Sequence, residues 1–273
     1  MEIPRLPFKK MHGSGNDFIL VDNREGLIRP WEAGPLALKL CRRRTDVGAD
    51  GLILIEEARD ADFRWRFHNA DGSEAEMCGN GGRCAARFAH LTGICGPEMV
   101  FETLAGPIRA QVKGRRVKLE LPPPPEPPRE MELQLHGRPW RLSSINTGVP
   151  HAVLMVDDLD STPVFDLGRL IRHHPAFAPA GTNVDFVKVE EGRIAIRTYE
   201  RGVEGETLAC GTGSVAAALV AGLQGLVESP VEVTTWGGEE LTVHFRLRGE
   251  GIEEVFLEGD TVVVYSGVLD GDL

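Results

Sequence analysis

The pattern Cys-Gly-x-Gly occurs twice in this chain of 273 residues, at Cys78 and at Cys210, 132 positions apart. Each copy lies just before a stretch with helical patterning, residues 82–91 and residues 213–223, so each predicts a cysteine at a helix start. A single copy would be explained by packing, because buried cysteine is usually an inert small side chain. Two matched copies favour a duplication and predict two halves with the same fold.

Apolar runs between Gly, Asp and Pro predict strands on both sides of a proline-rich segment, residues 122–128. So many prolines exclude a helix or a central strand, so this segment is the expected boundary. The stretch 213–223 is apolar on all sides and must be buried all round. We therefore expect an α/β (α+β) fold of two pseudo-symmetric halves, each a mainly antiparallel sheet rolled around a central helix. Strands are expected at 18–21, 51–55, 63–67, 117–121, 153–156, 184–189, 194–199, 231–235, 241–245, 255–257 and 262–265, and two shorter helices at 34–41 and 167–173.

A weaker similarity supports the duplication. Asn-Asp-Phe at 16–18 and Asn-Val-Asp-Phe at 183–186 both stand at the start of an apolar run. We expect these two segments to be equivalent in the two halves.

The formal net charge of −11 argues against a partner that is a nucleic acid or an anionic membrane. The sequence has no apolar run of about 18 residues and no signal-peptide pattern at its start, which predicts a cytoplasmic protein without a membrane partner. Five cysteines without a C-x-x-C pair indicate neither a disulfide framework nor a zinc ribbon. The histidines His12, His68 and His151 are not spaced as metal ligands, so no metal is predicted.

A cysteine at a helix start has a specific chemistry. Unpaired amides and the positive end of the helix dipole stabilise a thiolate and bind a carboxylate. If two such halves face one small acid, one thiolate removes a proton from a carbon and the other thiol delivers a proton to the opposite face. This inverts a stereocentre without a cofactor. The other cysteines, Cys41, Cys84 and Cys95, have no such context and are expected to serve packing.

Most of the six asparagines lie in glycine-rich or motif-like stretches, and an amide offers both a donor and an acceptor to a zwitterionic amino acid. Turn formation explains some of them equally well. Glu200 and Arg201 would bind an ammonium and a second carboxylate, or form a surface ion pair; the sequence leaves both readings open.

Together these residues resemble the diaminopimelate epimerase family. The resemblance extends over nearly the whole chain and rests on residues 11–18, 67–84, 150–151, 199–202 and 209–213. It implies an active site in the cleft between the two halves, a homodimer, and no pyridoxal phosphate or other cofactor. It further implies interconversion of LL- and meso-2,6-diaminopimelate in lysine and peptidoglycan precursor synthesis. The family's last strand returns to the first half, which implies halves of residues 1–121 with 263–273 and of residues 122–262.

The resemblance also implies site residues by position. Cys78 and Cys210 match the acid/base pair. The backbone around the reacting carboxylate would come from Gly79, Asn80, Gly211 and Thr212. Substrate contacts would come from Asn16, Asn69, Asn183, Glu200 and Arg201, with Arg201 on the distal carboxylate. His151 and Glu200 match residues that tune the site, and Tyr265 matches a dimer contact.

The chain departs from the family at two positions, because Val149 and Gly51 stand where many members have Asn and Gln. Both changes concern recognition of the distal end of the substrate. Two other classes stay open on the sequence: another two-cysteine amino-acid racemase, of the proline racemase type, and a non-catalytic amino-acid-binding protein. A racemase of that type usually has Pro before the second cysteine and His after the first Cys-Gly, where this chain has Ala209 and Asn80.

Overall fold

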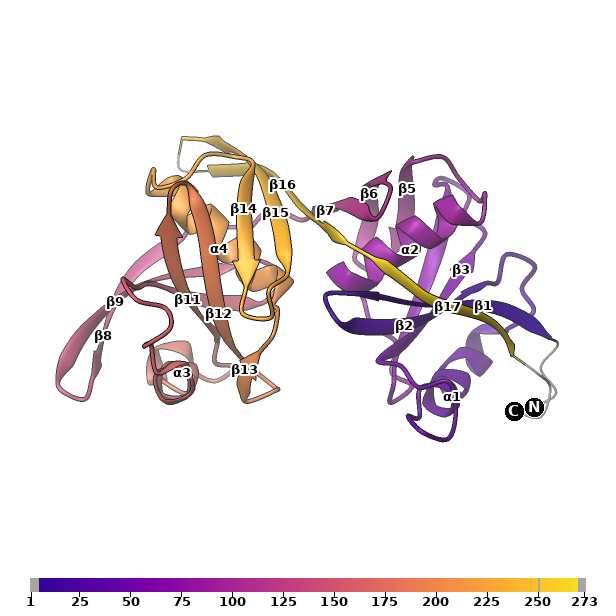
Figure 1. Ribbon diagram of the computed structural model, residues 1–273, viewed down its shortest axis with the longest axis horizontal. Helices are drawn as coiled ribbons and strands as arrows, with labels where there is room; N and C mark the ends of the chain where they lie inside the picture. Colours follow the sequence, from indigo (N-terminus) through magenta and orange to yellow (C-terminus); the bar gives the residue numbers. More distant parts are fainter. Residues whose placement is uncertain (1–4, 250, 270–273) are drawn as a thin grey trace. The chain divides into compact units, whose positions relative to one another are not determined.

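The computed structural model describes residues 5–249 and 251–269. Residues 1–4 and 270–273, the outermost parts of the expected first half, lie outside this description. The chain forms two compact units (Figure 1): unit 1 is Met1–Glu120 with Gly259–Leu273, and unit 2 is Leu121–Glu258. Residues 122–128 form neither helix nor strand, as their prolines require.

Unit 1 is a strongly bent sheet with two helices. Its elements are β1 (Leu6–Gly13), β2 (Asn16–Asp22), α1 (Pro30–Leu40), β3 (Gly51–Glu56), β4 (Phe63–Asn69), α2 (Gly79–Leu91), β5 (Glu98–Thr103), β6 (Gly106–Lys113), β7 (Arg116–Leu121) and β17 (Val262–Leu269). The strands pair in the order β17, β1, β2, β3, β4, β5, β6, β7. Only β2–β3 and β4–β5 are parallel in this series, and each of these pairs is connected through a helix.

Unit 2 repeats this order. Its elements are β8 (Arg129–Leu135), β9 (Arg138–Asn146), β10 (Pro150–Met155), α3 (Val164–Arg172), the 3-10 turn η1 (Pro175–Phe177), β11 (Asn183–Glu190), β12 (Arg193–Glu200), β13 (Gly205–Thr207), α4 (Gly211–Leu223), β14 (Val231–Thr235), β15 (Glu240–Arg248) and β16 (Gly251–Asp260). The main series is β8, β9, β10, β11, β12, β14, β15, β16, with β10–β11 and β12–β14 parallel. Among the described strands only the short β13 lacks a counterpart, and η1 is a further addition to unit 2, so the predicted pseudo-symmetry is confirmed.

One central helix packs inside each unit. α2 contacts β1, β2, β3 and β6, and α4 contacts six strands of unit 2. All residues from 213 to 221 on α4 are buried, as its wholly apolar sequence predicts. Each sheet is therefore wrapped around its helix, and the helix N-terminus becomes the place where strand ends and helix amides meet.

The topology corrects one part of the predicted duplication. The strand equivalent to β2 is β10, and the strand equivalent to β11 is β3. Asn16 begins β2 and Asn183 begins β11, so the two Asn-containing segments are not equivalent. Their similarity is local: each sequence starts a buried strand.

Candidate active site

Cys78 and Cys210 are the N-cap residues of α2 and α4. Both have extended backbone, with φ of −147° and −126°. The carbonyl of each accepts the first helical hydrogen bond, from Gly82 at 2.8 Å and from Ser214 at 2.9 Å. The amides between cap and first bond are the unpaired ones of a helix start. Each unit thus places one thiol beside a set of free N–H donors.

Burial is the largest influence on the pKa of each of these thiols. Burial raises the pKa of the Cys78 thiol, and the backbone N–H groups of the first helical turn lower it only in part. Burial raises the pKa of the Cys210 thiol well above its usual value, and the charges of Glu200 and Asp185 raise it further. The sequence predicts an activated thiol at each helix start. The loss of water opposes this activation and outweighs the effect of the helix amides.

In unit 1 the Cys78 thiol donates to Oδ1 of Asn16, with 3.6 Å from sulfur to oxygen. The amide Nδ2 of Asn16 donates to Asp50 at 2.7 Å, and Arg43 binds the same carboxylate at 2.8 Å. Because Nδ2 is held by a carboxylate, the amide must present its oxygen to the thiol. Asn16 therefore accepts from Cys78 and stabilises its protonated form.

The other two asparagines of unit 1 that the sequence predicts as site residues have partners of their own. Oδ1 of Asn80 accepts from Arg83 at 2.8 Å, and the same guanidinium nitrogen donates to Ser14. Asn69, at the end of β4, donates to the hydroxyl of Ser73 at 3.0 Å. Asn80 thus lies on the first turn of α2 beside Cys78, whereas Asn69 bonds within its own turn.

In unit 2 a fully buried histidine joins the strands to α4. His151 Nδ1 lies 2.7 Å from Oδ2 of Asp185, and both side chains have no exposed area. The hydroxyl of Thr198 donates to the other oxygen of Asp185 at 2.8 Å. On its far side, His151 Nε2 lies 3.1 Å from Oγ1 of Thr212, and this hydroxyl is 3.5 Å from the sulfur of Cys210. His151 is therefore linked to Cys210 through one hydroxyl.

The remaining predicted residues of unit 2 surround this link. Asn183 is buried, and its Oδ1 accepts from the backbone N–H of Arg201 at 2.8 Å. Its Nδ2 is 3.4 Å from His151 Nε2. Glu200 accepts from the hydroxyl of Thr207 at 2.8 Å. The guanidinium of Arg201 lies 3.5 Å from the carbonyl oxygen of Gly181.

The glycines of the repeat differ in what surrounds them. A Cβ at Gly79 would meet nothing within 4 Å, and one at Gly211 would lie 3.1 Å from Leu257. Two positions further on, a Cβ at Gly213 would lie 2.5 Å from Oδ1 of Asp185. Gly213 is therefore required for the close approach of the carboxylate to α4, whereas Gly79 leaves open space next to Cys78.

Sequence reasoning missed Asp185 and Thr198. Both lie on strands with buried neighbours, and a lone polar residue in such a strand has no spacing that marks it. The available signal was Asp185 itself, an acidic residue inside an apolar run, because a buried charge needs a partner. Asp50 was also missed, although it directly precedes β3.

The predicted dimer residue Tyr265 lies on β17 and is 44% exposed, with its ring edge-on to Phe8 at 5.9 Å. Gly51 is one of the two positions where the chain differs from many family members. A Cβ there would lie 2.5 Å from the ring of Phe67, so this position has no room for the Gln of other members. Val149, the other departure, lies half-buried in the turn before β10.

The three other cysteines are placed as packing residues. Cys84 is completely buried on α2, and Cys41 is 4% exposed in the cluster beside α1. The sulfur of Cys95 lies 3.7 Å from that of Met99. Burial raises the pKa of Cys84 to about 12 and those of Cys41 and Cys95 to about 11.

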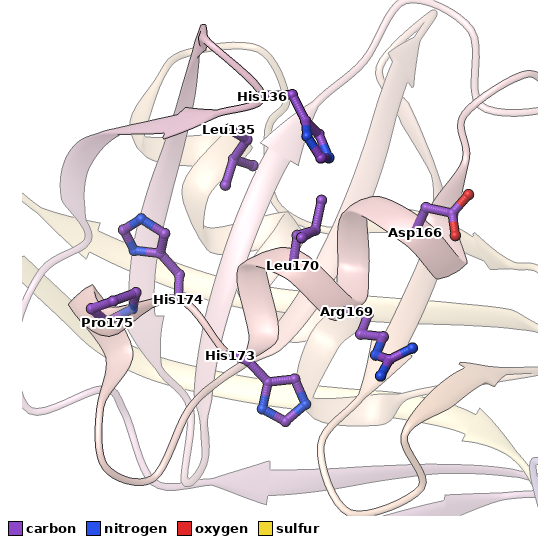
Figure 2. A pocket seen from close by; sticks show the side chains of 8 residues that line it. All are labelled: Leu135, His136, Asp166, Arg169, Leu170, His173, His174 and Pro175. Carbon is purple, nitrogen blue, oxygen red and sulfur yellow. The ribbon is translucent and has the colours of Figure 1, made fainter.

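A cavity of about 840 Å³ lies elsewhere in unit 2, beside α3 (Figure 2). Its lining includes His136, His173 and His174 but none of the predicted site residues. Within residues 5–249 and 251–269, no group of three or more His, Cys, Asp or Glu side chains is arranged to hold a metal ion. In the same ranges, no helix is long and apolar enough to cross a membrane.

Solved structures of other proteins share this fold. A PhzF-family phenazine biosynthesis protein of Bacillus anthracis superposes with a TM-score of 0.69 at 16% identity, covering 97% of this chain and 99% of the other. A probable proline racemase of Agrobacterium radiobacter superposes with a TM-score of 0.66 at 18% identity, covering 98% and 93%. At these identities the likeness concerns the fold alone.

Sequence relatives identify the family. The diaminopimelate epimerase family model matches residues 8–121 and 143–263. Diaminopimelate epimerases of Aquifex aeolicus and Archaeoglobus fulgidus are 49% and 43% identical, over 98% and 97% of this chain and 99% and 96% of their own lengths. The chain belongs to the diaminopimelate epimerase family and is an isomerase.

Proposed function

We propose that the protein interconverts LL- and meso-2,6-diaminopimelate without a cofactor, with Cys78 and Cys210 as the two proton-transfer groups. The observation that carries the proposal is the matched pair of thiols, each the N-cap of the central helix of its unit. Inversion needs one group on each face of the α-carbon, and a duplicated fold supplies one such group per unit. The proposal requires that both thiols reach the same α-carbon of the bound substrate.

The helix starts give this proposal its carboxylate site. Amides of Gly79 and Asn80 in unit 1, and of Gly211 and Thr212 in unit 2, are free of helical partners. They would bind the carboxylate next to the reacting carbon and stabilise the charge that develops when its proton leaves.

Polar side chains around the thiols would hold the rest of the substrate. Asn16, Asn69 and Asn183 offer amide donors and acceptors, Glu200 a carboxylate for an ammonium, and Arg201 a guanidinium for the distal carboxylate. His151 and Glu200 would tune the reactivity of the thiols. His151 is linked to Cys210 through the hydroxyl of Thr212, and the charge of Glu200 raises the pKa of Cys210.

The wider setting of this reaction is also a proposal. The family assignment supports a role in lysine and peptidoglycan precursor synthesis in the cytoplasm, without pyridoxal phosphate. It supports a homodimer too, with Tyr265 of β17 as a contact.

The first test follows the α-proton. The purified protein is incubated with LL-diaminopimelate in deuterated water, and we expect meso product that carries deuterium at the inverted carbon. A parallel incubation with L-proline tests the racemase alternative. Uptake with proline alone would replace the proposed substrate, and no uptake with either would leave only a binding protein.

The second test removes the thiols one at a time. Cys78→Ala and Cys210→Ala should each reduce turnover by at least about 100-fold, because each removes one acid/base group. Cys95→Ala is the matched control, since Cys95 is also half-buried but lies away from both helix starts. Turnover that survives in either of the first two variants contradicts the two-thiol mechanism.

A further inference from the structure

The hydrogen bonds around His151 fix where its proton lies. An ionised Asp185 accepts only, so Nδ1 of His151 donates to it at 2.7 Å. Asn183 has its Oδ1 on the backbone N–H of Arg201, so its NH₂ group faces His151 Nε2. Because this NH₂ group is a donor, Nε2 must be the acceptor and carries a lone pair rather than a proton. His151 is thus neutral, with its proton on Nδ1.

The same hydrogen-bond argument gives the orientation of the Thr212 hydroxyl. Its hydroxyl lies 3.1 Å from the Nε2 lone pair and donates to it. The oxygen of that hydroxyl then accepts from the thiol of Cys210, 3.5 Å away. All donors from Cys210 to Asp185 point the same way, toward the carboxylate, which has its second oxygen held by Thr198. Aligned donors of this kind provide a path along which a proton can shift.

Unit 1 has no such path at the equivalent positions. Strand register aligns Phe18 with His151 and Ile53 with Asp185, because Phe18 pairs with Gly51 as His151 pairs with Asn183. Phe67 pairs with Ile53, and Thr198 pairs with Asp185, so Phe67 is the equivalent of Thr198. In unit 1 these three positions are therefore all apolar. Cys78 donates instead to Asn16, whose amide cannot take up a proton.

We propose that Cys210, Thr212 and His151 form a proton relay and that Asp185 positions it, so that Cys210 loses and regains its proton through His151, whereas Cys78 has no such path. This inference rests on the proposed function and deepens it. It makes the two halves chemically unequal although their backbones match.

The relay step balances within the protein. The proton of Cys210 moves to the oxygen of Thr212, and the hydroxyl proton of Thr212 moves to Nε2 of His151. The products are the Cys210 thiolate and an imidazolium, which the carboxylate of Asp185 stabilises. The charged and titratable groups around the relay are Asp185 on β11, Glu200 at the end of β12 and Cys210 itself. Gly213 allows the carboxylate to approach the first turn of α4.

A pair of variants at Thr212 tests the relay. Thr212→Val keeps the shape but removes the hydroxyl, and kcat should fall by about 100-fold with KM changed much less. Thr212→Ser keeps the hydroxyl and should restore kcat to within about threefold of the original. Equal kcat values for the Val and Ser variants would overturn the relay, because a steric or structural role does not depend on the hydroxyl.

Asp185→Asn tests the positioning residue by its pH profile. The amide oxygen can still accept from His151 Nδ1, but the negative charge that stabilises the imidazolium of the relay is lost. We expect kcat to drop roughly tenfold or more and the acidic limb of the kcat profile to move to lower pH. Asp160→Asn removes a charge from an exposed position in the same unit and should change neither. A loss of kcat in Asp185→Asn with an unmoved limb would show a structural role only.

A measurement without substrate separates this inference from the proposed function. In protein with ¹⁵N-labelled histidine, the His151 signals should report the tautomer with hydrogen on Nδ1, assigned by their loss in His151→Asn. Hydrogen on Nε2, or an imidazolium at neutral pH, overturns the relay even if the epimerase reaction occurs. The expected tautomer without any reaction of diaminopimelate would instead reject the proposed function.

Discussion

At the scale of single residues, the two thiols share a backbone position but not their surroundings. Burial raises the pKa of both, and for Cys210 the charges of Glu200 and Asp185 add to that effect. Burial thus favours the protonated form of both thiols, so the helix start does not by itself supply a base. What it supplies is a donor-rich site for a carboxylate next to a thiol that another group has to deprotonate.

Alkylation rates test this protonation state. The rate at which iodoacetamide modifies Cys78, which has no histidine relay, should rise about tenfold for each pH unit up to about pH 9, because the thiolate reacts and the raised pKa keeps its fraction small below that. Peptide mass spectrometry of time courses measures each site separately. Cys84, which is fully buried, should stay unmodified in the folded protein. A rate that is flat between about pH 6 and pH 8 would mean that a thiolate is already present.

The same scale shows what the sequence could predict of the site. Cys78 and Cys210 were predictable because a repeated pattern distinguishes them from the other cysteines. Asn183 and His151 were predictable only through the family resemblance. Asp185 was not, since its role depends on strand register, which places it opposite Thr198 and beneath Gly213.

At the scale of elements, strands with several apolar residues close together were predictable, including β14, which is buried on one face, whereas strands rich in charged or polar residues were not. β3 has buried residues at its first five positions and reads as a continuous apolar run. β6 and β8 alternate exposed charged or polar residues with buried ones, and no apolar run marks them. The helices α2 and α4 begin at Gly79 and Gly211, earlier than expected, because glycines at the helix start carry no apolar signal.

Equivalent glycines on these two helices should respond differently to alanine. A Cβ at Gly81 would lie 3.3 Å from Ile53 and Trp65, side chains that can shift by tenths of an ångström. A Cβ at Gly213 would lie 2.5 Å from the Asp185 carboxylate. Gly213→Ala should therefore lower the free energy of unfolding by about 1–3 kcal/mol and reduce kcat by displacing Asp185. Gly81→Ala should stay within about 1 kcal/mol, since alanine also favours the helix. Urea unfolding and kcat measure both, and equal losses would contradict the close contact at Gly213.

At the scale of the whole molecule, duplication supplied two similar frameworks whose buried residues differ. The main strands pair in the same order in both units. Beneath one helix start the chain has Phe18 and Ile53, and beneath the other it has His151 and Asp185. These pairs share no sequence similarity, so only the topology reveals that they are equivalent. The difference fits a reaction that needs two thiols with different proton affinities at any one time.

The assembly of the whole chain gives the last prediction. β17 exposes Val264, Tyr265 and Val268, at 53%, 44% and 49%, and β1 is its partner strand in the described register. An exposed apolar strand of this kind is suited to contact a second copy. Light scattering should therefore give about twice the chain mass of 29.8 kDa.

Tyr265→Glu should yield monomers, because it places a charge in the contact, whereas Tyr265→Phe keeps the ring against Phe8 and should stay dimeric. Leu226→Glu adds the same charge at a similarly exposed position in unit 2 and should leave the dimer intact. A monomeric parent chain, or a dimer that survives Tyr265→Glu, would exclude β17 as the contact.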